Sequence, residues 1–101
     1  MQIDIEATNI ELTAPLREYI EEKMGKLNKF LKPFEGSDLR VRVEVARTSK
    51  HHRQGDVYRA EANLYLPGKI LRAEHKSDDI RVAINQVKDK LQREIRKHKT
   101  D

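Results

Sequence analysis

The chain has 101 residues, of which 37% are hydrophobic and 38% charged, and its formal net charge is +4. This length predicts one domain, residues 1–101, with a modest core. The absence of cysteine excludes disulfides and thiolate chemistry and fits a reducing compartment. The N-terminus has no signal-peptide pattern, and no apolar stretch approaches the ~20 residues of a membrane span. We therefore expect a soluble, cytoplasmic domain without a membrane partner, whose basic balance favours polyanions.

The first thirty residues predict a strand followed by a helix. The strand alternates apolar with polar residues, and its inward side chains are Met1, Ile3, Ile5 and Ala7. Thr13 is the predicted N-cap of the helix, and Pro15 fits its first turn because a proline N–H would have no partner there. We expect this helix to run to about Leu31, where Lys32 and Pro33 stop it.

Three further stretches, residues 39–45, 57–66 and 70–76, alternate in the same way and predict three more strands. The last two are joined by Pro67 and Gly68, which suit the two central positions of a type II turn. These strands should therefore form a hairpin.

The last quarter of the chain predicts a second helix, with Ser77 as its cap and Asp78 and Asp79 in its first turn. One narrow apolar stripe runs along it, formed by Ile80, Ile84, Val87, Leu91 and Ile95. Basic residues occupy both shoulders of that stripe on a helical wheel. One shoulder holds Lys90, Arg93 and Lys97, and the other holds Arg81, Lys88, Arg96 and Lys99.

The predicted fold class is α+β in the order β-α-β-β-β-α. Four strands with one apolar face each and two one-sided helices can bury their apolar surfaces if both helices cover the same face of the sheet. The opposite sheet face should then carry charged side chains that form solvated cross-strand ion pairs. A single tyrosine, Tyr65, lies on that face, which is too few for a platform that stacks nucleobases.

Signals of enzymatic chemistry are weak. The chain has no glycine-rich phosphate loop and no nucleophile motif. His51 and His52 are adjacent in a polar loop, but no ligand spacing of a known kind accompanies them, so we expect no metal. We predict that the protein is not an enzyme and needs no cofactor.

The basic residues favour a phosphate-binding surface. Lys23, Lys26 and Lys29 form a row on the first helix, while Glu18, Glu21 and Glu22 lie on its other side. If the two helices lie side by side, this row can meet the basic row of Lys90, Arg93 and Lys97 across the seam. Two facing rows of cations at helical pitch suit a nucleic-acid backbone. The alternative is a solvated charged face with no anionic partner.

The segment MQIDIEATNIELTAPLREYIEEKMGKLNKFL resembles the start of bacterial ribosome hibernation promoting factors, which include the ribosome-associated translation inhibitors. The matching features are the opening strand, the Asn-Ile-Glu-Leu-Thr run before the first helix, and the sequence from Lys26 to Phe30. The second helix matches better, through its Ser-x-Asp start, Ala83 and Ile84, and the basic pattern that begins at Asp89. The similarity spans essentially the whole chain.

This resemblance implies a fold like that of double-stranded-RNA-binding domains. It also implies binding in the mRNA and tRNA channel of the small ribosomal subunit, where the protein blocks translation by exclusion and protects idle ribosomes or ribosome dimers. The partner is then ribosomal RNA of the decoding region, and no DNA is involved. The positions expected to contact rRNA phosphates are Lys23, Lys26, Lys29, Lys88, Lys90, Arg93, Lys97 and Lys99.

The chain departs from the family pattern in two places. The loop KHHRQGD is longer and more basic than in many members, which predicts an additional rRNA contact through Lys50, His51, His52 and Arg53. The sequence ends just after the second predicted helix, before the C-terminal dimerisation domain of the long form, so we expect a short form or the N-terminal domain of a long form. A short form implies a separate factor that dimerises ribosomes. The rival function is a protein–protein regulatory domain that uses its sheet edge or exposed face.

Overall fold

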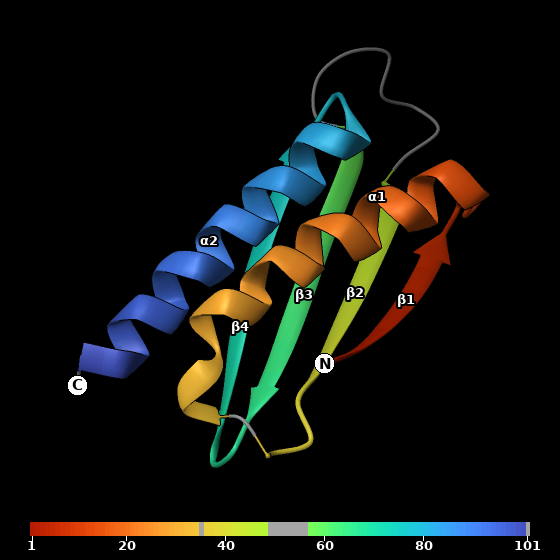
Figure 1. Ribbon diagram of the computed structural model, residues 1–101. Helices are drawn as coiled ribbons and strands as arrows, with labels where there is room; N and C mark the ends of the chain where they lie inside the picture. Colours follow the sequence, from red (N-terminus) through yellow and green to blue (C-terminus); the bar gives the residue numbers. More distant parts are fainter. Residues whose placement is uncertain (35, 49–56, 101) are drawn as a thin grey trace.

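The computed structural model describes residues 1–34, 36–48 and 57–100 (Figure 1). Its elements follow the predicted order. They are β1 (Gln2–Thr8), α1 (Ala14–Gly25), the 3₁₀ helices η1 (Lys26–Phe30) and η2 (Lys32–Phe34), β2 (Arg40–Arg47), β3 (Tyr58–Leu66), β4 (Lys69–Ser77) and α2 (Ile80–Thr100). The predicted α+β class and element order are confirmed.

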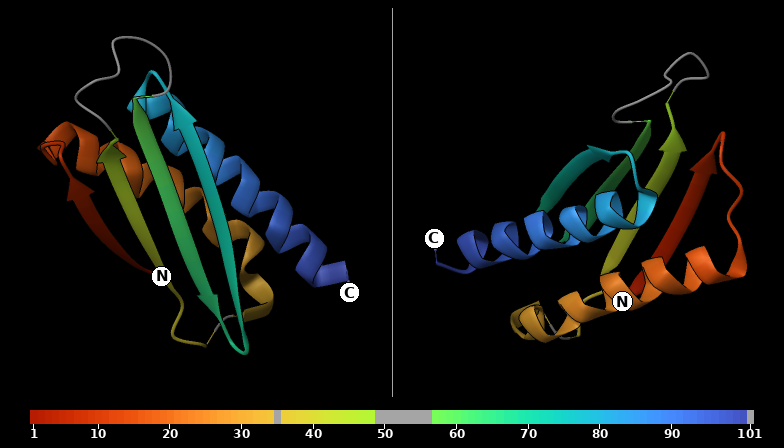
Figure 2. Two further views of the ribbon diagram at one scale, coloured as in Figure 1. Left: turned by 180° about the vertical axis from the view of Figure 1, so that it is seen from behind. Right: turned by 90° about the horizontal axis from the view of Figure 1, so that it is seen from above.

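The four strands form one mixed sheet in the order β1-β2-β3-β4. β1 runs parallel to β2, with Gln2 opposite Arg40, while the other neighbours are antiparallel. The β3–β4 hairpin turns at Pro67 and Gly68, and Gly68 has φ 76°, the left-handed value that the second central position of a type II turn requires. Figure 2 shows that both helices cover the same face of this sheet, as predicted.

The first helix begins as predicted and ends earlier. Thr13 is its N-cap, and the Thr13 hydroxyl accepts a hydrogen bond from the Leu16 N–H at 3.3 Å. The prediction of one helix to Leu31 is wrong, because the α-helix stops at Gly25 and the chain tightens into η1. Glycine has a low helix propensity, and the tighter 3₁₀ turn still buries both Leu27 and Leu31.

The cap of α2 also differs from the prediction. Asp79, not Ser77, caps the helix, since the Asp79 carboxylate accepts the Arg81 N–H at 2.9 Å and the Asp79 carbonyl accepts the Ala83 N–H. Ser77 is a buried residue at the end of β4, and its hydroxyl accepts the Asp79 N–H at 3.1 Å. The short polar side chain of Ser77 therefore stabilises the turn that precedes the helix.

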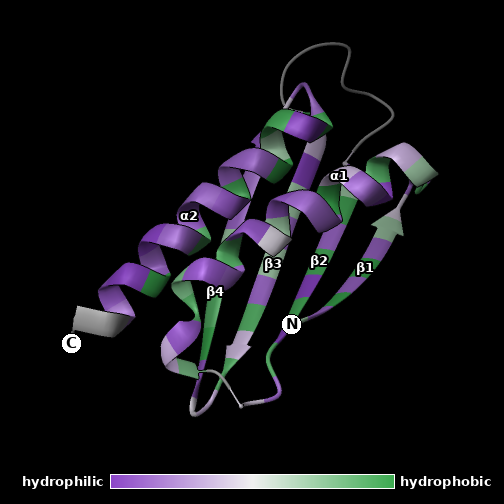
Figure 3. Ribbon diagram, in the orientation of Figure 1, coloured by the Kyte–Doolittle hydropathy of each residue, from purple (hydrophilic) through white to green (hydrophobic). Residues whose placement is uncertain are grey.

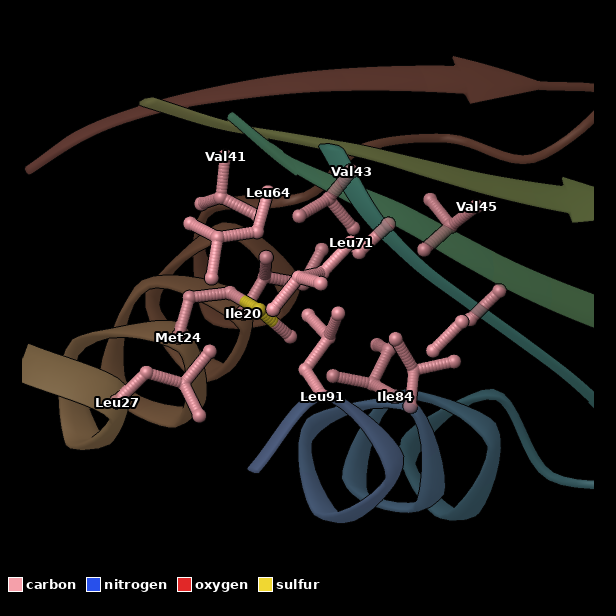
Figure 4. Close-up of a cluster of buried hydrophobic side chains, with 14 of the residues drawn as sticks. Ile20, Met24, Leu27, Val41, Val43, Val45, Leu64, Leu71, Ile84 and Leu91 are labelled. Carbon is pink, nitrogen blue, oxygen red and sulfur yellow. The ribbon is translucent and has the colours of Figure 1, made fainter. Parts of the chain in front are cut away.

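One apolar core joins the two layers (Figure 4). Ile20 and Met24 approach from α1, Leu27 from η1, and Ile84 and Leu91 from α2. The sheet contributes the fully buried residues Val41, Val43, Val45, Ala60, Ala62 and Leu64. Each buried Val, Leu or Ile side chain stabilises the fold by about 1.5–3 kcal/mol, so both helices are held firmly on the sheet.

Candidate nucleic-acid interface

The positive charge of the molecule is concentrated in α2. This helix contains seven Lys or Arg residues and two acidic ones, a formal charge of +5 in a chain whose net charge is +4. Figure 3 shows hydrophilic residues along the solvent side of both helices and hydrophobic ones toward the sheet. Ile84, Val87, Leu91 and Ile95 of the apolar stripe are fully buried, so the cations of α2 are presented outward on the two flanks.

The flank of α2 that lies beside β4 carries one basic row. Lys90, Arg93 and Lys97 line a hollow of about 300 Å³ together with Arg72 and Glu74 of β4. Within the described residues Arg93 is exposed and has no ion-pair partner. This flank therefore offers cations at helical spacing, which suits successive phosphates of a nucleic-acid backbone.

The predicted meeting of this row with the first helix is wrong. Lys90 donates a hydrogen bond to the main-chain oxygen of Glu74 at 2.7 Å, which directs the row toward the outer strand β4. The opposite shoulder of α2 faces α1 through Arg81 and η1 through Arg96. The order of the strands places α2 over the β4 side of the sheet. The row of Lys90, Arg93 and Lys97, which was expected to face the first helix, therefore faces outward beside β4.

The contact between α1 and the start of α2 centres on Tyr19. The Tyr19 hydroxyl donates to the Arg81 carbonyl at 3.2 Å. The Arg81 guanidinium lies 4.8 Å from the centre of the Tyr19 ring, and the Lys23 amine lies 5.4 Å from it. Such cation–π contacts stabilise by about 0.5–1 kcal/mol when exposed, so these two cations are held over the ring.

A second aromatic cluster lies near the other end of the helix pair. Lys29 and Arg96 lie 5.2 and 5.3 Å from the centre of the Phe30 ring. Phe34 stacks on His98 with ring centres 5.8 Å apart. The seam between the helices therefore holds cations on aromatic rings, which fixes the direction of the side chains without neutralising their charge.

Three predicted contact residues are partly neutralised within the chain. Lys97 lies 3.7 Å from Glu94, three positions earlier on α2. Lys26 lies 3.9 Å from Glu22, one turn earlier on the helix. Lys88 lies 2.7 Å from Asp89, and only 15% of the Lys88 side chain is exposed. Of these lysines Lys88 is the least exposed, whereas Lys97 keeps 72% of its side chain exposed.

The outer face of the sheet carries balanced charge, as predicted. Its cations are Arg40, Arg42, Arg59, Arg72 and Lys76, and its anions are Asp4, Glu6, Glu44, Glu61 and Glu74. Arg40 lies 3.6 Å from Asp4, and Arg42 forms an ion pair with Glu6. Most of this charge is thus satisfied by cross-strand partners.

Arg59 is the centre of this ion-pair network. It pairs with Glu44 at 3.5 Å and Glu61 at 2.7 Å, and its Nε donates to Glu74 at 2.8 Å. The hydrogen bond from Arg59 lowers the pKa of Glu74 below its usual value, and the same bond raises the pKa of Arg59. Arg72 also pairs with Glu61, so one carboxylate bridges two guanidinium groups.

Some predicted positions lie outside the described residues. These are Lys50, His51, His52 and Arg53, and the side chain of Lys99. In the part of the chain that the structure describes, no three His, Asp or Glu side chains gather closely enough to hold a metal ion. Over the same residues no helix combines the length and the apolar character that crossing a membrane requires.

Together the fold and this surface define a class of protein: a four-stranded α+β domain that presents a basic helical layer on one side and a charge-balanced sheet on the other. More particularly, residues 3–101 match the model of the family described as Sigma 54 modulation protein / S30EA ribosomal protein, and the chain belongs to this family. The predicted family is confirmed, and with it the prediction of a protein that is not an enzyme.

Two curated relatives are ribosome hibernation promotion factors. The protein of Deinococcus radiodurans is 38% identical over 101 residues, which are 99% of this chain and 50% of that protein. The protein of Staphylococcus aureus is 31% identical over 100 residues, which are 99% of this chain and 49% of that protein. The chain therefore spans about half the length of these relatives.

Two solved structures share the fold. The Protein Y N-terminal domain of Thermus thermophilus superimposes with a TM-score of 0.77 at 24% identity. The match covers 97% of this chain and 99% of the Thermus thermophilus chain. A ribosomal subunit interface protein of Coxiella burnetii has a TM-score of 0.78 at 21% identity and covers 100% of both chains. The arrangement of strands and helices is thus common to proteins whose sequences differ widely.

Proposed function

We propose that this domain binds the small ribosomal subunit in the channel for mRNA and tRNA, inhibits translation by steric exclusion, and stabilises idle ribosomes or ribosome dimers. The two curated relatives are named ribosome hibernation promotion factors, and this proposal extends that function to the chain. A cytoplasmic location follows from the same proposal.

The observation that supports the proposal best is the charge of α2. A helix of formal charge +5 that lies on a charge-balanced sheet gives the molecule one phosphate-binding side. We assign the main contacts to Arg93 and Lys97, with Lys90 beside them. The remaining proposed contacts are Lys23, Lys26, Lys29, Lys88, Lys99 and the loop residues Lys50, His51, His52 and Arg53.

The mechanism needs no chemical step. Electrostatic attraction holds the basic side of the domain against rRNA, and the volume of the domain excludes ligands that need the same space. Because each phosphate contact releases counterions, the affinity should fall steeply between about 50 and 200 mM salt.

Co-sedimentation with purified small subunits across a salt series tests this function, with large subunits as the control. We expect saturable binding to small subunits that weakens with salt and is lost when initiator tRNA and mRNA are bound first. Equal binding to large subunits, or binding that persists with tRNA and mRNA in place, would contradict the proposed site.

A protein–protein regulatory role is the second candidate, because the sheet has a free edge at β1. It predicts association that tolerates salt and does not depend on the charge of α2. The salt series therefore separates the two functions in one experiment.

A further inference from the structure

The two edge strands of the sheet are not equally open. β1 and β4 each have one strand neighbour. On β4, the Lys90 amine reaches over from α2 and occupies the main-chain oxygen of Glu74. A lysine placed on an edge in this way hinders the pairing of another strand. Within the described residues no side chain makes such a contact to the main chain of β1.

The open edge of β1 presents backbone groups at known positions. The Gln2 N–H bonds to the Leu39 carbonyl across the parallel β1–β2 ladder. A residue of a parallel strand directs both its N–H and its C=O to one neighbour, and the next residue directs them the other way. Ile3, Ile5 and Ala7 therefore direct their N–H and C=O groups to the open side, where Figure 1 shows no strand beyond β1.

The inner face of β1 is incompletely covered. Ile3, Ile5 and Ala7 are half-buried, whereas the corresponding inner residues of β2, such as Val43, are fully buried. Figure 2 shows α2 over β3 and β4, whereas β1 forms the opposite edge of the sheet. An added strand with apolar side chains beside Ile3 and Ile5 would complete the burial of these inner side chains of β1.

The outer face of β1 carries two carboxylates, Asp4 and Glu6, which form ion pairs with Arg40 and Arg42 of β2. Asp4 and Glu6 still have 44% and 53% of their side chains exposed, so each can accept a second cation, as Glu61 does from two arginines. A hollow of about 260 Å³ lies beside them, lined by Asp4, Ile5 and Glu6 of β1 and by Arg40 and Arg42 of β2. Since opposite charges on neighbouring strands stabilise a sheet, an added strand should carry Lys or Arg on this face.

A second copy of β1 does not meet this requirement. Two β1 strands could pair antiparallel with their outer faces on the same side of the sheet. Asp4 or Glu6 of one copy would then lie directly or diagonally opposite Asp4 or Glu6 of the other copy. Like charges on adjacent strands are destabilising. Charge therefore disfavours a second copy of β1 as the occupant of this edge.

We propose that the open edge of β1 binds an extended, cationic segment of a partner protein by strand addition. Apolar residues of that segment pack beside Ile3 and Ile5, and alternate lysines or arginines face Asp4 and Glu6. Main-chain hydrogen bonds to residues 3, 5 and 7 provide the affinity, and the carboxylates provide the selectivity. This surface lies at the opposite edge of the sheet from Lys90, Arg93 and Lys97 of α2, so it is separate from the proposed rRNA contact.

The test uses a capped eight-residue peptide that alternates valine with lysine, titrated into the ¹⁵N-labelled chain. We expect saturable shifts of the backbone amides of Ile3, Ile5 and Ala7, and none along β4. A matched peptide that alternates valine with glutamate should not bind. Equal binding of both peptides, shifts along β4 in place of β1, or no shifts at all would overturn the proposal.

Two variants test the contacts separately. Ala7→Pro removes a free edge N–H without removing a ladder hydrogen bond, and it should abolish peptide binding. The double variant Asp4→Asn, Glu6→Gln keeps the shape of both side chains and should weaken the lysine peptide about fivefold at low salt. Unchanged peptide affinity in both variants would refute strand addition at β1.

The same titrations separate this surface from the rRNA function. Ala7→Pro should leave co-sedimentation with small subunits unchanged, whatever the result with the peptide. If a single-stranded RNA oligonucleotide shifts the β1 amides and the valine–lysine peptide does not, the edge binds RNA and the proposal is wrong.

Discussion

The outer face of the sheet and the helical layer use charge in opposite ways. On the outer face of the sheet five cations balance five anions, and Arg59 by itself pairs with three carboxylates. On α2 the cations outnumber the anions by seven to two, and several of them lie against aromatic rings or main-chain oxygens. Cations paired with carboxylates stabilise the fold, whereas cations without them remain available to an external anion.

Reversing charge on α2 should have the largest effect. In the double variant Lys90→Glu, Arg93→Glu, we expect ribosome binding to be abolished while the fold remains intact, because two phosphate contacts become repulsive. Replacing Lys90 or Arg93 singly by a neutral residue should lower the slope of the logarithm of the binding constant against the logarithm of the salt concentration by about one unit. The measurement is co-sedimentation with small subunits, together with circular dichroism to confirm folding.

The matched control places the same charge change on the sheet. Arg40→Glu with Lys76→Glu alters the net charge equally, but both residues lie on the outer sheet face. Binding should be largely retained. If this control loses binding to the same extent as the α2 variant, the phosphate-binding side is not the helical layer.

Breaking the sheet network should affect stability and not binding. Arg59→Met leaves Glu44, Glu61 and Glu74 without their shared cation, and Glu61 is only 13% exposed. We expect a loss of about 2 kcal/mol in the free energy of unfolding, measured by urea denaturation. Arg59→Lys should recover part of it. Unchanged stability in the methionine variant would show that the network contributes little.

The smallest effect is a pH dependence at Glu74. The hydrogen bond from Arg59 lowers the pKa of Glu74 in the folded state, so its stabilisation is complete above the pKa of the unfolded chain. It is lost as the pH falls through the lower pKa of the folded protein. Glu74→Gln should therefore melt about 2–4 °C below the unaltered protein at neutral pH. This difference should shrink below about pH 4, and a constant difference across pH would contradict the assignment.

Much of the fold could be predicted from local pattern. Alternation identified the four strands, Thr13 was recognised as a cap, and the Pro67–Gly68 turn followed from the backbone preferences of its residues. The balanced outer face of the sheet was predicted for the same reason, because alternation alone determines which side chains point outward.

Apart from the early end of α1 at Gly25, the errors concern relations that local pattern does not contain. A helical wheel defines two shoulders of α2, but only the strand order decides which of them meets α1. The bond from Lys90 to the Glu74 carbonyl involves a main-chain atom, which leaves no trace in the side-chain pattern. Ser77 and Asp79 can both accept a backbone N–H, so the sequence alone does not show which of them caps α2. In the structure β4 extends to Ser77, and the helix is capped by Asp79.

The parallel pairing of β1 has a consequence for the order in which the sheet is assembled. Each residue of β1 lies opposite a residue 38 positions later, as Gln2 does opposite Arg40, whereas Leu66 and Lys69 in the β3–β4 hairpin are three positions apart. Loop-closure entropy makes the longer connection about 2 kcal/mol more costly. The strands β2, β3 and β4 can pair through nearer partners, so β1 is the strand whose attachment depends most on contacts formed elsewhere.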